Sequence, residues 1–134
     1  MEEFEEHCAK YVNAHQLRVG DEFSANEKNV RYKNIPDEPG MYVIRDAKTR
    51  DTYYVGETGR SIRKRIANHK RSIRDPDWPT EASGKKFHAA GVHDRRYVVE
   101  YLLSSDVNTQ TKQQRVLYEH MLIVTLNPLI YISD

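Results

Sequence analysis

The chain has 134 residues, of which 38% are hydrophobic and 31% charged, and its formal net charge is +1. This length suffices for one domain with a hydrophobic core, and no apolar run approaches the ~20 residues of a membrane-spanning helix. The single cysteine, Cys8, excludes an intrachain disulfide framework and a cysteine-rich zinc site. The acidic N-terminus is unlike a signal peptide, and we expect a protein of a reducing, cytoplasmic compartment that does not associate with membranes.

The N-terminal third of the chain is polar and weakly patterned. Residues 2–16 are predicted to form an amphipathic helix, because apolar residues recur in them at helical spacing. Residues 17–39 are polar, and we expect them to be irregular. We interpret residues 1–35 as a helical or irregular extension and residues 36–134 as the functional domain.

Two short runs rich in β-branched and aromatic residues follow, from Met41 to Arg45 and from Thr52 to Val55. With the charged segment between them, they predict a β-hairpin, and a similar run from Arg96 to Leu103 predicts a third strand. The order of these strands and the surrounding helices favours an α/β fold. We expect a small, mainly antiparallel three-stranded sheet flanked by helices.

A helix is predicted directly after the hairpin. Ser61 is a suitable N-cap, and three isoleucines between Ile62 and Ile73 recur at the spacing of one helical face. At about 100° per residue, Arg65 and His69 fall on or beside this apolar face. Such an arginine most often lies along the apolar surface with its charge in water, and such a histidine is most often a hydrogen-bonded core residue. A functional role for both is the alternative.

The same helix concentrates positive charge. No acidic residue interrupts the sequence from Arg60 to Arg74. A solvated charged face is the common explanation of such a run, and a surface that faces nucleic-acid phosphates is the alternative that we favour. The candidate nucleic-acid-binding residues are Arg60, Arg63, Lys64, Lys70, Arg71 and Arg74.

The C-terminal half adds a loop and a second long helix. Trp78 lies in a proline-containing loop, where it could pack on the core or stack on a base. A short helix is expected over residues 85–90. The last predicted helix, from about Lys112 to Leu126, is apolar in its second half, so Glu119 would place a carboxylate in a buried setting. A salt bridge to Arg115 or a bound metal ion would stabilise that charge.

These residues together resemble the GIY-YIG nuclease superfamily. Gly40-Met41-Tyr42 is similar to the first signature tripeptide of that family, and Tyr54-Val55-Gly56 is similar to the second. The helix that follows carries an arginine and a histidine four residues apart, as Arg65 and His69. Either tripeptide alone is weak evidence, whereas their spacing with this helix is specific.

The resemblance covers about residues 40–132 and leaves the N-terminal extension outside it. Leu126-Asn127-Pro128, after the last helix, is also similar to the family. Family members often have an asparagine a few residues after that proline, where this chain has Tyr131, and Asn127 could take over part of its role.

The resemblance implies a divalent-metal-dependent endonuclease that hydrolyses phosphodiester bonds in DNA. Tyr42 would be the general base, Tyr54 would position the water or phosphate, and His69 would relay or accept the proton. Arg65 would hold the scissile phosphate, and Glu119 would bind one Mg²⁺ or Mn²⁺ ion. A tyrosine has a pKa near 10, so Tyr42 could act as a base near neutrality only if positive charge from Arg65 or the metal lowers that pKa.

Several alternatives stay open. A non-catalytic nucleic-acid-binding module would have the basic helix but would not cleave. A nuclease toxin acting with an immunity partner would have the basic helix and would also cleave. RNA is an alternative substrate. The chain has little room for a separate DNA-binding module, so a compact restriction or phage nuclease is favoured, and a homo-oligomer would allow both strands to be cut.

Overall fold

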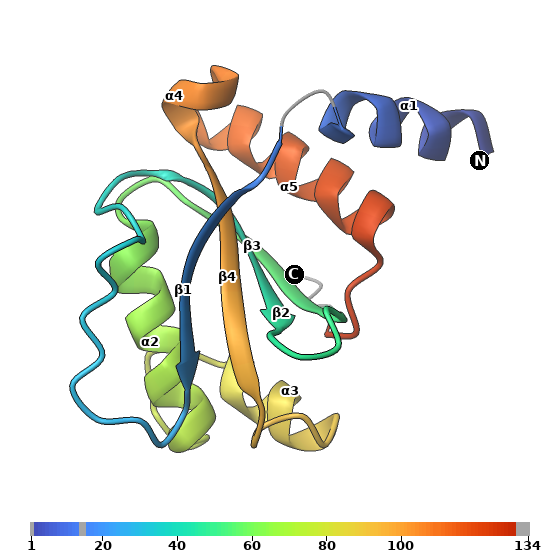
Figure 1. Cartoon of the computed structure of the whole chain (residues 1–134). Coiled ribbons are helices and arrows are strands. Elements are labelled where there is room, and N and C mark those ends of the chain that lie inside the picture. The colour runs from blue at the N-terminus through green and yellow to red at the C-terminus, as the bar shows by residue number, and fades with distance from the viewer. Residues whose placement is uncertain (1, 14–15, 131–134) are drawn as a thin grey trace.

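The computed structural model describes residues 2–13 and 16–130, which form one mixed sheet-and-helix unit (Figure 1). Its four strands are antiparallel to their neighbours in the order β1-β4-β2-β3. The predicted α/β class is therefore confirmed, with four strands in the sheet where three were expected. In chain order the elements are α1 (Glu2–Asn13), β1 (Arg18–Ser24), β2 (Gly40–Asp46), β3 (Thr52–Thr58), α2 (Ile62–Arg74), α3 (Ser83–Ala89), β4 (Arg96–Leu103), α4 (Ser104–Val107) and α5 (Lys112–Leu126).

The additional strand is β1, so the expectation that residues 17–39 are irregular is wrong for Arg18–Ser24. This edge strand pairs with β4 through an irregular register between Val19 and Glu22. Its residues are mostly exposed or half-buried, and Phe23 is its one fully buried side chain. A strand with so little alternation of apolar residues leaves no period-two signal in the sequence. The division of the chain at residue 35 stays a prediction, although β1 belongs to the same sheet as β2.

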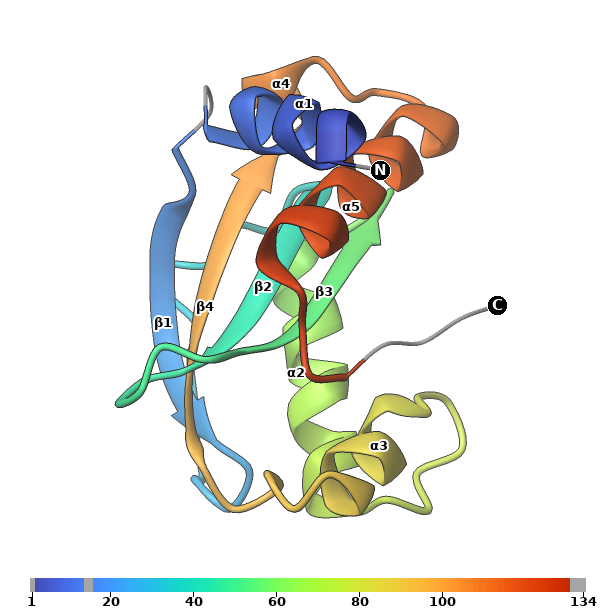
Figure 2. The same ribbon diagram turned by 90° about the vertical axis from the view of Figure 1, so that its right-hand side faces the viewer.

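The two faces of the sheet carry separate apolar cores. Tyr42 and Ile44 of β2 point into a core with the isoleucines of α2 and Phe87 of α3. Met41 and Val43 point the other way, into a core with Leu122 of α5. Figure 2 shows α2 behind the sheet and α5, with α1 beside it, in front of the sheet. Helix α3 contributes Phe87 to the core on the α2 side. Residues in the middle strands are thus buried on both faces.

Local capping sets the ends of the two long helices. The Ser61 hydroxyl accepts a hydrogen bond from the Lys64 N–H at 3.2 Å, which confirms the predicted N-cap of α2. Thr111 and Gln114 form a reciprocal capping box at the start of α5, whose bounds are those predicted. Helix α3 begins two residues earlier than expected, and α4 was not expected at all.

No helix among the described residues is long and apolar enough to cross a membrane. Tyr131, where the resembled family often has asparagine, lies outside the described residues. Asn127 forms the C-cap of α5 in the left-handed region, with its N–H donating to the Ile123 carbonyl.

Replacing Phe23 by alanine tests whether β1 is part of the core. Phe23 is fully buried and its ring centroid lies 5.1 Å from that of Tyr97, so Phe23→Ala should lower the free energy of unfolding by about 3–5 kcal/mol. Val19→Ala on the same strand is the control. Val19 is 62% exposed, so its truncation should change stability by no more than about 0.5 kcal/mol. Urea denaturation of both variants measures this, and equal small effects would contradict the assignment of Phe23 to the core.

Candidate active site

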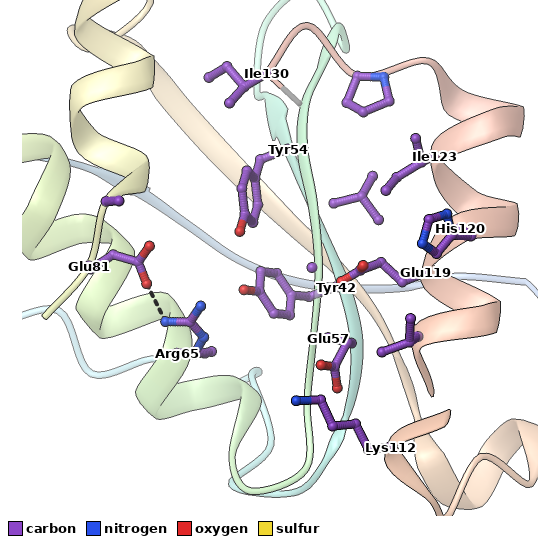
Figure 3. Close-up of a pocket in the computed structure, with 15 residues that line it drawn as sticks. Tyr42, Tyr54, Glu57, Arg65, Glu81, Lys112, Glu119, His120, Ile123 and Ile130 are labelled. Atoms are coloured by element: carbon purple, nitrogen blue, oxygen red, sulfur yellow. Dashed lines mark hydrogen bonds and ion pairs between the residues drawn. The ribbon is translucent and has the colours of Figure 1, made fainter. Parts of the chain in front are cut away.

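A cleft of about 450 Å³ opens beside β3, the edge strand opposite β1, between the α2–α3 side and α5. Four of the five catalytic candidates from the sequence line it, each from a different element: Tyr42, Tyr54, Arg65 and Glu119. Figure 3 shows the two tyrosine rings between Arg65 on one side and Glu119 on the other. The fifth candidate, His69, lies directly behind Tyr42. The fold therefore brings together residues that are up to 77 positions apart, from 42 to 119.

Tyr42 reaches the cleft because its neighbour in the sheet is a glycine. Tyr42 on β2 is directly opposite Gly56 on β3. A Cβ atom at position 56 would collide with the phenol of Tyr42. The Tyr42 side chain can thus cross over β3, the outermost strand, toward the cleft. This close approach is a physical reason for a glycine inside a strand, and for the last residue of the Tyr54-Val55-Gly56 motif.

His69 connects Tyr42 to the loop before α3. Its Nε2 is 2.6 Å from the Tyr42 hydroxyl, and its Nδ1 is 2.6 Å from the Ser83 hydroxyl. The Glu81 carboxylate lies 3.9 Å from Nδ1, which favours the tautomer with the hydrogen on Nδ1. In that tautomer the Tyr42 hydroxyl donates to Nε2, and Nδ1–H donates to Ser83. Both ring nitrogens are therefore satisfied inside the core.

Glu81 is a site residue that the sequence did not indicate. Its carboxylate forms an ion pair with Nη1 of Arg65 and accepts a hydrogen bond from the Ser83 N–H at 3.1 Å. It is buried and lines the cleft. Its position in a proline-containing loop carries no periodicity that would mark it. A hydrogen bond from Ser72 Oγ to the Glu81 carbonyl at 2.8 Å holds this loop against α2.

Burial dominates the acidity of the two tyrosines. It raises the pKa of Tyr42 well above its usual value, and Tyr54, Glu81 and Glu119 raise it further, while Arg65 acts in the opposite direction. Burial, with Glu81 and Glu119, likewise raises the pKa of Tyr54 to about 12. Arg65 lowers the pKa of both tyrosines, as the sequence led us to expect, but burial and the neighbouring acidic groups raise it by more. Both phenols are protonated at neutral pH.

The buried imidazole is neutral as well. Burial lowers the pKa of His69 to about 3, and Arg65 adds to this effect while Glu81 opposes it. Burial alone would raise the pKa of Glu81, but its interactions with His69 and Arg65 and the hydrogen bond from the Ser83 N–H together hold it below its usual value. Glu81 is thus an anion beside Arg65 at neutral pH.

Glu119 is half-buried on α5 at the wall of the cleft. Arg115, the ion-pair partner suggested by the sequence, has its Nε 3.2 Å from Glu57 Oε2 and donates from Nη1 to the Gln110 carbonyl. Among residues 2–13 and 16–130, no cluster of three or more His, Cys, Asp and Glu side chains is placed to hold a metal ion. One carboxylate still fits Mg²⁺, which keeps several waters and is usually bound through one or two carboxylates and substrate phosphates.

Lys112 adds a cation to the cleft. It is the first residue of α5 and lies exposed at the end of the cleft marked by Glu57 (Figure 3). The sequence shows only an isolated lysine at the start of a helix, so nothing in it signalled this position.

The nucleic-acid-binding candidates do not line this cleft. Arg60, Lys64 and Arg74 are exposed, whereas Arg63 is half-buried and its Nε donates to the Ile35 carbonyl at 2.8 Å. Lys70 is buried. The Arg71 guanidinium lies 4.6 Å from the centre of the half-buried Trp78 ring, which gives Trp78 a cation–π contact.

A scan of protein-family models and searches of curated proteins and solved structures found no match.

The pH dependence of stability tests the burial of His69. Its pKa is about 3 in the folded chain and about 6.5 in the unfolded chain, so the unfolded chain binds more protons between these values. Stability should therefore fall as the pH decreases from about 6.5 toward 3. We expect His69→Gln to remove a slope of up to about 1.4 kcal/mol per pH unit between pH 6.5 and 5, measured by urea denaturation.

Tyr53→Phe is the control for this experiment. It removes another buried hydrogen bond, from the Tyr53 hydroxyl to Asp46 at 2.7 Å, and should lower stability without changing the slope in that pH range. A parent-like slope in His69→Gln would contradict the assignment of a neutral, buried imidazole.

Proposed function

We propose that the protein is a divalent-metal-dependent endonuclease that hydrolyses phosphodiester bonds in DNA. The observation that carries this proposal is the convergence of Tyr42, Tyr54, Arg65 and Glu119 on one cleft, with His69 hydrogen-bonded behind Tyr42. The sequence alone predicts all five as site residues. Such a set offers a proton acceptor, a phosphate ligand and a metal ligand in one place, as phosphodiester hydrolysis requires.

Tyr42 would activate the attacking water. Its oxygen would accept a proton from the water as its own hydroxyl proton passes to Nε2 of His69, along the 2.6 Å hydrogen bond. The Glu81 anion near Nδ1 stabilises the imidazolium that this transfer creates. Tyr54, whose ring centroid lies 6.2 Å from that of Tyr42, is a hydroxyl donor that could orient the water or the phosphate.

Arg65 would bind the phosphate. A guanidinium has five N–H donors, and the ion pair with Glu81 engages Nη1, so other donors of Arg65 can face an incoming phosphate. Lys112 adds positive charge at the wall of the cleft. A metal ion, when bound by Glu119, would stabilise the negative charge of the leaving 3′ oxygen and lower the pKa of nearby hydroxyls.

A non-catalytic nucleic-acid-binding module is the second candidate. Two observations favour it: the raised pKa of Tyr42, and the pairing of Arg65 with Glu81. The two candidates differ in whether a phosphodiester bond is broken. The proposal includes DNA as the substrate, with RNA as the alternative. It also includes a homo-oligomer that cuts both strands.

Incubation with supercoiled plasmid tests the proposal directly. The parent should nick or linearise the plasmid with Mg²⁺ or Mn²⁺ and not with EDTA. Tyr42→Phe, which removes only one hydroxyl, should cut at least ~100-fold more slowly, the scale usual for a lost general base.

Tyr53→Phe again provides the matched control. It also loses one buried tyrosine hydroxyl, but Tyr53 does not line the cleft, so its cleavage rate should stay near that of the parent. If Tyr42→Phe cuts as fast as Tyr53→Phe, the role assigned to Tyr42 is wrong. A parent protein that binds DNA but never cuts it would favour the binding module.

The metal site can be tested without cleavage. A ligand that binds the folded chain alone raises its melting temperature, so millimolar Mg²⁺ or Mn²⁺ should stabilise the parent. Glu119→Gln keeps the size of the side chain and removes its charge, so this variant should stay folded, lose the metal-dependent rise and cut at least ~100-fold more slowly. Glu22→Gln, which changes an exposed carboxylate on β1, should keep the rise. An undiminished rise in Glu119→Gln would show that the metal binds elsewhere.

A further inference from the structure

A second cavity lies on another flank of α2, away from the candidate active site. It has a volume of about 290 Å³ and separates α2 from the segment 29–32, which precedes the sheet hairpin. It shares no lining residue with the cleft. Its polar lining consists of three cations, two amides and a phenol: Lys70, Arg71, Arg74, Asn29, Asn68 and Tyr32.

Lys70 is the decisive residue of this cavity. It is only 8% exposed, yet it has no hydrogen bond or ion pair among the residues that the structure describes. Its Nζ is not among the fully buried side-chain nitrogens and oxygens without a partner, so the aliphatic stem is covered while the ammonium group opens into the cavity. Burial and the like charges of Arg74 and Arg71 lower the pKa of Lys70, so the surroundings resist its charge. An anion in the cavity would offset this repulsion among the three cations.

The remaining lining groups are donors that suit an anion. Burial raises the pKa of Tyr32 to about 12, so its phenol is protonated and can donate a hydrogen bond. Asn29 and Asn68 each carry an amide NH₂ group. Glu27 is an acidic side chain close enough to affect both Tyr32 and Lys70, but it does not line the cavity, and its Oε2 accepts from Arg96 at 3.3 Å.

We propose that this cavity binds one phosphate group of a nucleic-acid strand, as a second anchor outside the cleft. The proposal rests on the proposed function for its ligand class and adds where the strand is held. Phosphate contacts from lysine, arginine, tyrosine and asparagine position a protein on nucleic acid without reading its sequence. Lys64 and Arg71, seven residues apart and exposed on α2, supply positive charge along the helix between the two flanks. A strand leaving Arg65 therefore has a path across α2 to Lys70.

The salt dependence of DNA binding tests this second anchor. Affinity of the full chain for a fluorescent 20-base-pair duplex is measured by anisotropy in EDTA, so that cleavage plays no part. The double variant Lys70→Met/Arg74→Gln should bind at least ~10-fold more weakly at 100 mM KCl, and its slope of log K against log[KCl] should be shallower by about 0.9, the value for one lost phosphate contact.

A matched double variant controls for total charge. Lys48→Met/Arg95→Gln removes the same two charges from exposed positions on the β2–β3 turn and before β4, and it should keep the parent slope. Equal slopes for the parent and the Lys70→Met/Arg74→Gln variant would overturn the proposal, as would equal losses in both double variants. Lys70→Met should melt at or near the parent temperature, because it keeps an apolar stem and removes the repulsion from Arg74 and Arg71, and Lys70→Arg should keep DNA binding. A large drop in melting temperature for Lys70→Met, with loss of binding in Lys70→Arg, would assign Lys70 to the fold and overturn the proposal.

Inorganic phosphate separates a nucleic-acid site from a site for a small anion. At 10 mM and matched ionic strength it should compete weakly with the duplex in the parent and compete less in the Lys70→Met/Arg74→Gln variant, which keeps only the Arg65 site. If phosphate binds the parent cavity while the double variant binds DNA normally, the cavity is a small-anion site and the proposal is overturned. Because no arm requires cleavage, a parent that never cuts would refute the endonuclease alone. A parent that cuts with an unchanged double variant would refute the second anchor alone.

Discussion

The buried hydrogen bond between Tyr42 and His69 is the constraint on which the site depends. A phenol and an imidazole inside an apolar core must satisfy each other, since an unpaired buried polar group costs about 1–3 kcal/mol. This requirement fixes α2 against β2 at a 2.6 Å contact, and the second nitrogen of His69 extends the constraint to Ser83 at the start of α3. Glu81, two residues before Ser83, is thereby brought to Arg65. The glycine at position 56 supplies the space that the phenol needs.

Much of the fold followed from local patterns in the sequence. The hairpin, the N-cap Ser61 and the bounds of α5 were predictable because each has a short-range cause: a β-branched run, a hydroxyl before an apolar stripe, and a capping box before an apolar helix. Strand β1 was not predictable on this basis. An edge strand needs hydrogen bonds on one side only and can expose most of its side chains, so its place is set by pairing with β4, 70 or more residues away.

The catalytic candidates were found because they sit in recognisable motifs, and the residues around them were missed because they do not. Glu81 and Lys112 enter the cleft through the packing of a loop and of a helix start, which local sequence does not encode. Lys70 lies on α2, and its role in binding nucleic acid stays a prediction. What covers its stem is the segment 29–32, whose backbone bends through left-handed residues at Asn29 and Tyr32. A helical wheel gives the direction of a side chain and says nothing of what covers it.

The balance of charge in the cleft couples its two proposed ligands. Glu81 and Glu119 both raise the pKa of Tyr42 and Tyr54, whereas Arg65 opposes them. A phosphate that enters must share Arg65 with Glu81, and it brings further negative charge toward Glu119. A divalent cation brings positive charge instead. It offsets the charge of Glu119 and so lowers the pKa of the two phenols. By thermodynamic linkage, each ligand should then increase the affinity of the other, so that the site would reach its active protonation state when both are bound.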